Sequence, residues 1–382
     1  MWWLKGLVAK CFIKCNINLL KMTLEKGNKI GVLQIITGLE YGGAEQVVYD
    51  LANNINRDNF DVYVVSITSK TDRYESFKKI GIDPWVMGID SQLNLFTVIS
   101  ETWKLHQMMT KKNIKIIHAH LYHALVVSTL LKLFDFNRKI VYTYHSNLHS
   151  FYKKIIMMMM FILKPFRNAD VVFSKVDKKY FTKSKFKIIP NGIKNEIDLL
   201  ENEDKGIFTF VCVARLRKVK NFQSLPAIVA DLKSRGDYKF QILIAGEGEM
   251  YKEIVHLIQK FDVSDKIKLL GLQKNVDAIY SKADVLLMPS LGEGMPITLL
   301  EAGLYGVTAI VTPVGSIPEY FNNETVYLAD INSFADKMEY AINNKIEIDK
   351  KGQLLKKHVL ANFLIENMVD KHEALYFEVN NI

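Results

Sequence analysis

The chain has 382 residues, of which 49% are hydrophobic and 24% are charged, and its formal net charge is +9. This composition excludes an intrinsically disordered protein, and the length favours two domains of somewhat under about 200 residues each. Its cysteines, Cys11, Cys15 and Cys212, have neither disulfide-framework nor zinc-site spacing, which argues against a disulfide-stapled secreted domain and fits a reducing cytoplasm.

The first segment of the chain is apolar and basic. Residues 1–20 contain no acidic residue, and three lysines interrupt their apolar run. A spanning helix needs about 20 predominantly apolar residues, so we expect an amphipathic helix that lies in a membrane interface. The alternative is that translation begins at Met22 and that this segment is an appendage.

A glycine-bearing loop follows the first strand that we expect, Ile30–Ile36. Tyr41, Gly42 and Gly43 lie in this loop, and a helix is expected from about Ala44. Glycines between a strand and a helix start let backbone N–H groups approach a phosphate without a Cβ in the way. A simple tight turn explains the same pattern equally well.

Further apolar runs alternate with helical stretches and predict a doubly wound parallel sheet. The expected strands are Asp61–Ile67, Ile114–Ala119, Ile140–Tyr144 and Val171–Ser174. Ligands of such sheets bind beyond the carboxyl ends of the strands, where this chain places His118, His120 and His145. Three histidines also suggest a metal site, but no acidic or cysteine partner has ligand spacing nearby, so we expect no metal.

A basic segment precedes the middle of the chain. Residues 153–187 contain ten lysines or arginines and two aspartates, which suggests an anionic partner, either lipid or nucleic acid, or a solvated surface without a partner. Within it, Ile155–Leu163 is wholly apolar and too short to span a bilayer. It is either a buried helix or a helix whose apolar side enters lipid.

A polar run, Lys194–Gly206, is the best candidate for a linker, and a second alternation of strands and helices follows it. The strand expected at Ile207–Ala214 leads directly into a basic loop that contains Arg215 and Lys220. Two more strands are expected at residues 240–245 and 267–270, and the second is followed by Gly271 and Leu272. This pattern predicts a second doubly wound domain.

Two glutamates surround a helix start in the most informative stretch, Met288–Glu319. Glu293 lies in a loop with two glycines, Pro296 suits the first helical turn, and Glu301 lies within the helix. A helix N-terminus favours an anion, and the two acids suit hydroxyl groups. A nucleotide sugar combines both groups, whereas the alternative is a pair of solvated glutamates.

The order of residue types in this stretch resembles the donor-site signature of the family 4 retaining glycosyltransferases. Pro-Ser, Glu-Gly-x-Pro, Leu-Glu-Ala and two later glycines, followed by Pro-Glu, occur together with a strand, loop, helix and strand. The Thr-x-His at His145 and the Pro-Asn-Gly at residues 190–192 are also similar to the family. Met295 stands where an aromatic residue is usual, and Ser316 replaces the second of two glycines.

The resemblance implies a GT-B architecture of two Rossmann-like domains that face a central cleft. It divides the chain into an N-terminal extension, an acceptor domain, a nucleotide-sugar donor domain and a helix that crosses back, at residues 1–28, 29–195, 205–365 and 366–382. It assigns catalysis to His145, Glu293, Arg215 and Lys220. It assigns donor binding to Gly42, Gly43, Arg215, Lys220, Gly271, Leu272, Glu293, Gly294, Met295, Pro296, Leu300 and Glu301. Tyr41 and His120 become candidates for the acceptor side.

The activity that the resemblance implies is transfer of a sugar, with retention, from a nucleotide-diphosphate sugar to a hydroxyl. The donor is a co-substrate, and neither a cofactor nor a metal is expected. We expect a lipid-linked saccharide acceptor in bacterial surface polysaccharide synthesis, an anionic membrane surface, no nucleic acid, and a cytoplasmic protein peripheral on the inner face of the plasma membrane. The alternatives are a nucleotide-sugar epimerase or phosphorylase on the same fold, and a non-catalytic protein that binds anionic lipid.

Overall fold

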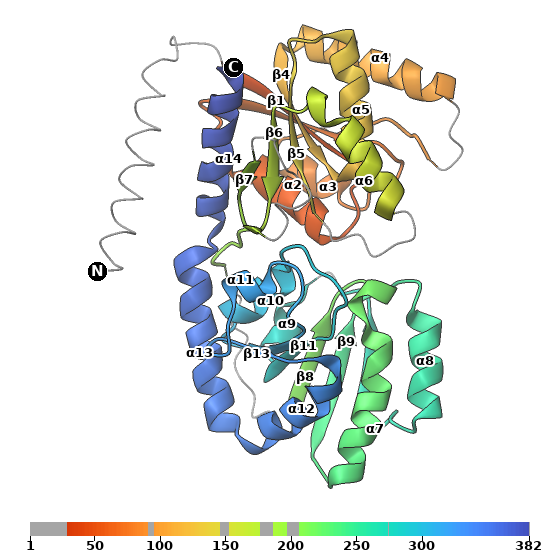
Figure 1. The fold of residues 1–382 in the computed structure, drawn as a ribbon, viewed down its shortest axis with the longest axis vertical. Coiled ribbons are helices and arrows are strands. Elements are labelled where there is room, and N and C mark those ends of the chain that lie inside the picture. The colour runs from red at the N-terminus through yellow and green to blue at the C-terminus, as the bar shows by residue number, and fades with distance from the viewer. Residues whose placement is uncertain are drawn as a thin grey trace.

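Two parallel sheets, one from each half of the chain, form the centre of the computed structural model (Figure 1). The structure describes residues 29–90, 95–145, 153–175, 186–196, 206–273 and 275–381. The expected N-terminal amphipathic segment, and parts of the basic segment and the linker, lie outside these residues. The doubly wound α/β prediction is confirmed for both halves.

Within the described ranges, the first sheet has seven strands in the order β3-β2-β1-β4-β5-β6-β7, and every neighbouring pair is parallel. Its strands are β1 (Ile30–Ile36), β2 (Phe60–Ser66), β3 (Trp85–Val86), β4 (Ile114–His120), β5 (Lys139–Thr143), β6 (Ala169–Val172) and β7 (Phe186–Ile188). Every residue of β1 is buried, because helices cover both faces of a parallel sheet.

In the described residues of the first half, five helices pack on this sheet in two hydrophobic layers. They are α2 (Gly43–Asn54), α3 (Tyr74–Lys79), α4 (Leu95–Lys111), α5 (Leu121–Phe134) and α6 (Lys153–Ile162). Helix α6 is partly buried, since Met160 lies in the core while Phe161 is 74% exposed. No helix in the described ranges combines the length and the apolar character needed to cross a membrane.

The second sheet, as far as the structure describes this half, has six parallel strands in the order β10-β9-β8-β11-β12-β13. Its strands are β8 (Phe208–Val213), β9 (Phe240–Ala245), β10 (Ile267–Gly271), β11 (Val285–Met288), β12 (Thr308–Val311) and β13 (Tyr327–Leu328). Its helices are α7 (Leu225–Arg235), α8 (Tyr251–Lys260), α9 (Asp277–Tyr280), α10 (Ile297–Leu304), α11 (Ile317–Tyr320) and α12 (Phe334–Asn343).

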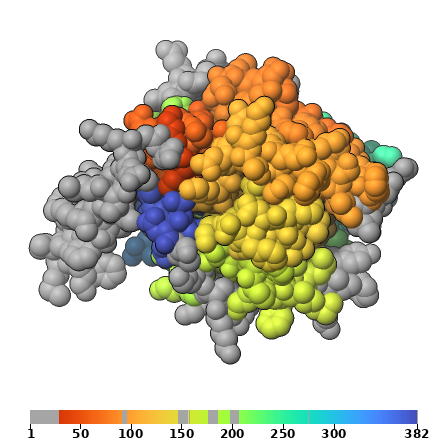
Figure 2. Space-filling view, turned by 90° about the horizontal axis from the view of Figure 1, so that it is seen from above, coloured from red at the N-terminus to blue at the C-terminus, as the bar shows by residue number. Residues whose placement is uncertain are grey.

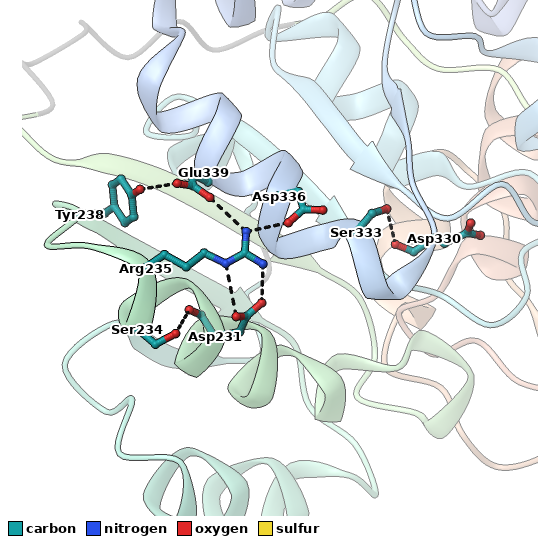
Figure 3. A network of polar contacts seen from close by, with 8 residues as sticks. All are labelled: Asp231, Ser234, Arg235, Tyr238, Asp330, Ser333, Asp336 and Glu339. Carbon is teal, nitrogen blue, oxygen red and sulfur yellow. Dashed lines mark hydrogen bonds and ion pairs between the residues drawn. The ribbon is translucent and has the colours of Figure 1, made fainter.

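An exposed ionic network joins α7 to α12 on the outside of the second domain (Figure 3). Arg235 donates to Asp231 on its own helix and to Asp336 and Glu339 on α12. Hydrogen bonds to these three carboxylates raise the pKa of the arginine above its ordinary value. The network orients two surface helices, and exposed pairs of this kind contribute little each to stability.

The last two helices connect the domains. Helix α13 (Lys345–Asn362) packs beside the second sheet, and α14 (Ile365–Asn380) continues upward to the first sheet, where it joins the core beside α2 (Figure 1). The chain after β7 meets this crossing, and a Cβ on Gly192 would lie 2.7 Å from the Cα of Ile365. The segment after β7 and the connection between α13 and α14 therefore touch backbone to backbone, which only glycine permits.

Candidate active site

The two sheets reverse their direction of growth at equivalent places, between β1 and β4 and between β8 and β11. Ligands of doubly wound sheets bind outside the carboxyl ends of the strands at these points. The loop of Tyr41 to Gly43 follows β1, Arg215 follows β8, and Glu293 follows β11. The segments that the sequence singled out are therefore those at the two switch points.

Arg215 connects the two switch points. Its Nε donates to the carbonyl oxygen of Tyr41 at 2.7 Å. Its terminal nitrogens lie 3.7 Å from a carboxylate oxygen of Glu40 and 3.8 Å from one of Glu45. A Cβ on Gly42 would lie 3.1 Å from the guanidinium and 2.5 Å from the Glu45 carboxylate. The glycine thus leaves room for an arginine that reaches across from the other domain.

Lys220 and Glu293 form the second charged pair of the site. The lysine Nζ lies 2.7 and 2.8 Å from the two carboxylate oxygens. Ser290, at the end of β11, donates to the same carboxylate at 2.6 Å. Glu293 is only 6% exposed, so these contacts hold its side chain in one orientation against the loop that precedes α10.

Glu301 lies in α10 and accepts a hydrogen bond from the hydroxyl of Tyr280 at 2.8 Å. Burial raises the pKa of Glu301 to about 7, and the hydrogen bond from Tyr280 opposes that rise. Tyr280 stacks on Tyr305 with ring centroids 5.6 Å apart. The carboxyl group is therefore poised between its two protonation states near neutral pH.

The loop before α10 is in direct contact with the first domain. A Cβ on Gly294 would lie 2.4 Å from the carbonyl oxygen of His145. Asn191 donates from its side-chain nitrogen to the carbonyl oxygen of Met295 at 2.8 Å. On the other side of the site, Gly43 faces Ile297, the first residue of α10. The start of α10 is thus enclosed by segments of the first domain.

The two positions that depart from the family signature touch each other. The hydroxyl of Ser316 lies 3.2 Å from the sulfur of Met295, and both side chains are buried. The neighbouring Gly315 has a φ of +61°, and a Cβ there would lie 1.9 Å from the carbonyl oxygen of Glu293. The glycine that this turn requires is therefore present, and the serine follows it in ordinary right-handed geometry.

His145 lies at the edge of the first sheet next to this loop, and its Nε2 is 2.8 Å from Nδ1 of His120. Burial lowers the pKa of His145 to about 3 and that of His120 well below its ordinary value. His120 was expected at the acceptor side, and this expectation needs correction. His120 is fully buried behind His145, and both of its ring nitrogens bond to protein groups, the second to Gln34.

Four further candidates carry no charge. The side chain of Leu300 is fully buried in the hydrophobic core of the second domain, so it supports α10 from within. Gly271 ends β10, and Leu272 is 47% exposed beside it. The amide of Leu272 lies 3.4 Å from a carboxylate oxygen of Glu247, which places this turn next to the Gly-rich turn after β9. Pro296 caps the start of α10.

Sequence reasoning did not assign Tyr280, Ser290 or Glu45 to the site. Ser290 is the serine of the Pro-Ser element, and Glu45 comes two residues after Gly43. Their places in the sequence next to recognised site residues were a signal that could have been used. Tyr280 comes from α9, 21 positions before Glu301, and no local pattern marks it. The described part of the chain contains no group of three or more metal-ligating side chains placed to hold an ion.

Two families match this chain. Residues 41–196 match the family described as Glycosyltransferase Family 4, and residues 194–357 match the family described as Glycosyl transferases group 1. N-acetyl-alpha-D-glucosaminyl L-malate synthase of Bacillus anthracis is 27% identical over 222 residues, which are 57% of this chain and 56% of that protein. The chain thus spans a little over half the length of this curated relative.

Other relatives match along almost their whole length. The Campylobacter jejuni protein named GalNAc-alpha-(1->4)-GalNAc-alpha-(1->3)-diNAcBac-PP-undecaprenol alpha-1,4-N-acetyl-D-galactosaminyltransferase is 23% identical over 91% of this chain and 94% of that protein. The crystal structure of HepE from Anabaena in complex with UDP and glucose superimposes with a TM-score of 0.78 at 17% identity, over 90% of this chain and 98% of that one.

Proposed function

We propose that this chain transfers a sugar from a nucleotide-diphosphate sugar to a hydroxyl of a lipid-linked saccharide. The chain joins a Glycosyltransferase Family 4 domain to a glycosyl transferases group 1 domain and so belongs to the GT-B glycosyltransferases. One observation carries the proposal. Arg215, Lys220 and Glu293 come from the carboxyl ends of two strands of the second sheet, and Arg215 bonds to the glycine loop of the first sheet.

The two cations suit the leaving group of this reaction. When the bond between sugar and phosphate breaks, negative charge grows on the nucleotide, and fixed cations stabilise that charge most in the transition state. Arg215 offers a planar fork and Lys220 a compact charge, so they can hold different phosphate oxygens. In this structure Arg215 pairs with Glu45, among others, and Lys220 pairs with Glu293. A bound diphosphate would replace these carboxylates as the partner of the two cations.

The two glutamates suit hydroxyl groups, because an ionised carboxylate only accepts hydrogen bonds. We assign the ribose hydroxyls to Glu301 and the hydroxyls of the transferred sugar to Glu293. Neither acid then acts as a covalent nucleophile, so we infer front-face attack by the acceptor hydroxyl with retention of configuration and without a divalent metal. The structural likeness to HepE with UDP and glucose supports uridine donors as the first to test.

The acceptor is inferred from relatives and from one face of the first domain. The Campylobacter jejuni relative is named for a diphosphoundecaprenol-linked saccharide. Figure 2 shows α4, α5 and α6, coloured orange to yellow-green, next to one another at the end of the molecule that the first domain forms. Helices α4 and α6 each carry an exposed phenylalanine, Phe96 at 78% and Phe161 at 74%, and Phe136 just after α5 is 68% exposed.

We infer that this face, which we call the α4–α6 face, rests on the inner leaflet of the plasma membrane. Apolar side chains would enter the interface while lysines such as Lys164 meet anionic headgroups. A small apolar cavity between α5 and α6 is lined by Tyr122, Met160 and His145. The face is thus adjacent to the site histidine, and an acceptor anchored in lipid would have a short path to it.

The test of transfer uses panels of UDP-, GDP-, ADP- and dTDP-sugars with undecaprenyl diphosphate-linked saccharides, with product detected by mass spectrometry. We expect Arg215→Ala and Glu301→Ala to lower the rate by about 100-fold or more. Arg235→Ala removes an arginine of the exposed network instead and should leave the rate unchanged. Full activity of the Arg215 variant would contradict the site assignment.

Further arms of the same assay test the finer statements. Product with an inverted anomeric configuration by NMR would contradict retention, and loss of activity in EDTA would contradict metal independence. A sugar converted with donor alone would favour an epimerase. Flotation with vesicles of anionic lipid should recover the protein, whereas Phe161→Asp and Phe96→Asp together should reduce recovery; equal recovery would remove the membrane contact from these helices.

A further inference from the structure

A line of hydrogen bonds runs from His145 into the core of the first domain and ends on the C-terminal helix. Nε2 of His145 lies 2.8 Å from Nδ1 of His120, and Nε2 of His120 lies 2.8 Å from the amide oxygen of Gln34. The amide nitrogen of Gln34 donates to the hydroxyl of Tyr376 at 2.9 Å. Three strands of one sheet and α14 thus contribute to a single line that begins at the active site.

The line continues beyond Tyr376 to a second strand end. The Tyr376 hydroxyl lies 2.6 Å from Nδ1 of His118, and Nε2 of His118 lies 2.6 Å from the hydroxyl of Thr143. His118 and Tyr376 are fully buried, and Thr143 is 1% exposed. Because these groups are shielded from water, each must satisfy its hydrogen bonds within the line, and the direction of one bond fixes the next.

Gln34 sets the direction. Its amide oxygen only accepts, so the facing Nε2 of His120 carries a proton. A neutral imidazole has one N–H, which leaves Nδ1 of His120 as an acceptor for the N–H at Nε2 of His145. The amide nitrogen of Gln34 only donates, so the Tyr376 oxygen accepts this hydrogen bond. The Tyr376 hydroxyl in turn donates to Nδ1 of His118. Each donor in the line then meets an acceptor.

His145 and His120 are both neutral near pH 7. Burial is the main cause that lowers the pKa of His145 to about 3 and that of His120 well below its ordinary value. Glu373 interacts electrostatically with Tyr376 and accepts a hydrogen bond from the Asn56 amide. His372 of α14 also lies beside the line, with its ring centroid 5.5 Å from that of His118. Its Nδ1 faces the carbonyl oxygen of Met368 at 2.9 Å, so it carries its proton there and does not join the line.

We propose that Gln34, His120 and Tyr376 are positioning residues that hold His145 as the tautomer protonated at Nε2, so that its Nδ1 presents a lone pair to a hydroxyl of the bound sugar. Nδ1 of His145 has no hydrogen-bond partner within the described ranges. The inference rests on the proposed function for the identity of the ligand. The opposite orientation of the Gln34 amide would reverse every bond in the line and turn Nδ1 of His145 into a donor.

The histidine tautomers can be measured directly, without donor or acceptor. We would label the full-length protein with ¹⁵N-histidine and record long-range ¹H–¹⁵N spectra near pH 7. Two histidines serve as internal references because each faces a carbonyl oxygen, which only accepts. His372 should carry its proton on Nδ1, whereas His358 should carry it on Nε2, which lies 2.8 Å from the carbonyl oxygen of Tyr320.

The expected result is that His145 and His120 are both neutral and protonated at Nε2. A proton on Nδ1 of His145, or a doubly protonated ring, would overturn the proposal. Gln34→Met removes both polar atoms at similar volume, and Tyr376→Phe removes only the hydroxyl. Each should convert the His145 signal to a tautomer mixture; an unchanged signal in both variants would also overturn it.

The effect on activity provides a second readout. Each variant should lower kcat/KM by about tenfold, as expected for one weakened hydrogen bond to the sugar. Tyr327→Phe, a buried tyrosine of the other domain, should leave both tautomers and rate unchanged. If no nucleotide sugar supports transfer, the proposed function fails while the tautomer result stands. If transfer occurs and His145 is protonated at Nδ1, only the present inference fails.

Discussion

Replacing Glu301 by glutamine should make the protein more stable and less active at the same time, and both effects should depend on pH. Burial raises the pKa of Glu301 from its ordinary 4.5 to about 7. Because folding raises this pKa, the carboxyl contributes its stability in full below about pH 4.5, and that contribution is lost as pH rises through 7.

The size of the effect follows from the pKa. One pKa unit corresponds to about 1.36 kcal/mol, so the ionised Glu301 side chain lowers the free energy of unfolding by up to about 3 kcal/mol above pH 7. Glutamine does not titrate. The free energy of unfolding of Glu301→Gln should therefore exceed that of the wild type by an amount that grows by up to about 3 kcal/mol between pH 4.5 and 8.

Urea unfolding followed by circular dichroism at several pH values measures this difference, with Glu253→Gln, an exposed glutamate on α8, as a control. Affinity for the nucleotide should change in the opposite direction. The wild type should bind more tightly as pH rises through 7, since the carboxylate then accepts the ribose hydroxyls, whereas Glu301→Gln should bind weakly throughout. Parallel stability curves for wild type and Glu301→Gln would refute the reasoning.

Other substitutions test how the loops of the site are packed. Gly294→Ala would place a Cβ 2.4 Å from the His145 carbonyl oxygen, so we expect kcat/KM to fall at least about tenfold with an unchanged circular dichroism spectrum; normal kinetics would show that the loop can move away. Ser316→Gly and Met295→Phe each disturb a buried contact, whereas the double variant restores the family pattern. The double-mutant cycle in unfolding free energy should show coupling of about 0.5 kcal/mol or more, and strict additivity would show that the two departures are independent. Gly192→Ala should destabilise the crossing of the chain onto α14 by about 1 to 3 kcal/mol, measured as a lower midpoint of urea unfolding; an unaltered midpoint would contradict the close approach.

The positions of most elements could be predicted because they depend on local patterns. Largely apolar runs marked β1, β9 and β11, since strands buried on both faces of a parallel sheet have no polar side to alternate. Pro296 and the glycines around Glu293 marked the start of α10, because each restricts or frees the backbone locally. The short strands β3 and β13 are only two residues long, and β3 carries no signal of its own.

The roles of His120 and Tyr280 could not be predicted in this way. The sequence around a histidine at a strand end is the same whether its side chain faces the cleft or the core. The structure places His120 behind His145. Tyr280 lies on a helix of four residues, and its importance comes from Glu301, which a separate helix brings to it. Burial and partners are properties of the folded chain, so local sequence gives no access to them.

The sequence alone determined where backbone can approach a phosphate, where strands end, and which charged side chains follow those ends, because glycine, proline and apolar periodicity act over a few residues. The tertiary structure alone decided which of those ends face each other. The contact of Arg215 with Tyr41 spans 174 positions, and that of Gln34 with Tyr376 spans 342. Such pairs form only when two domains dock and the last helix returns to the first sheet.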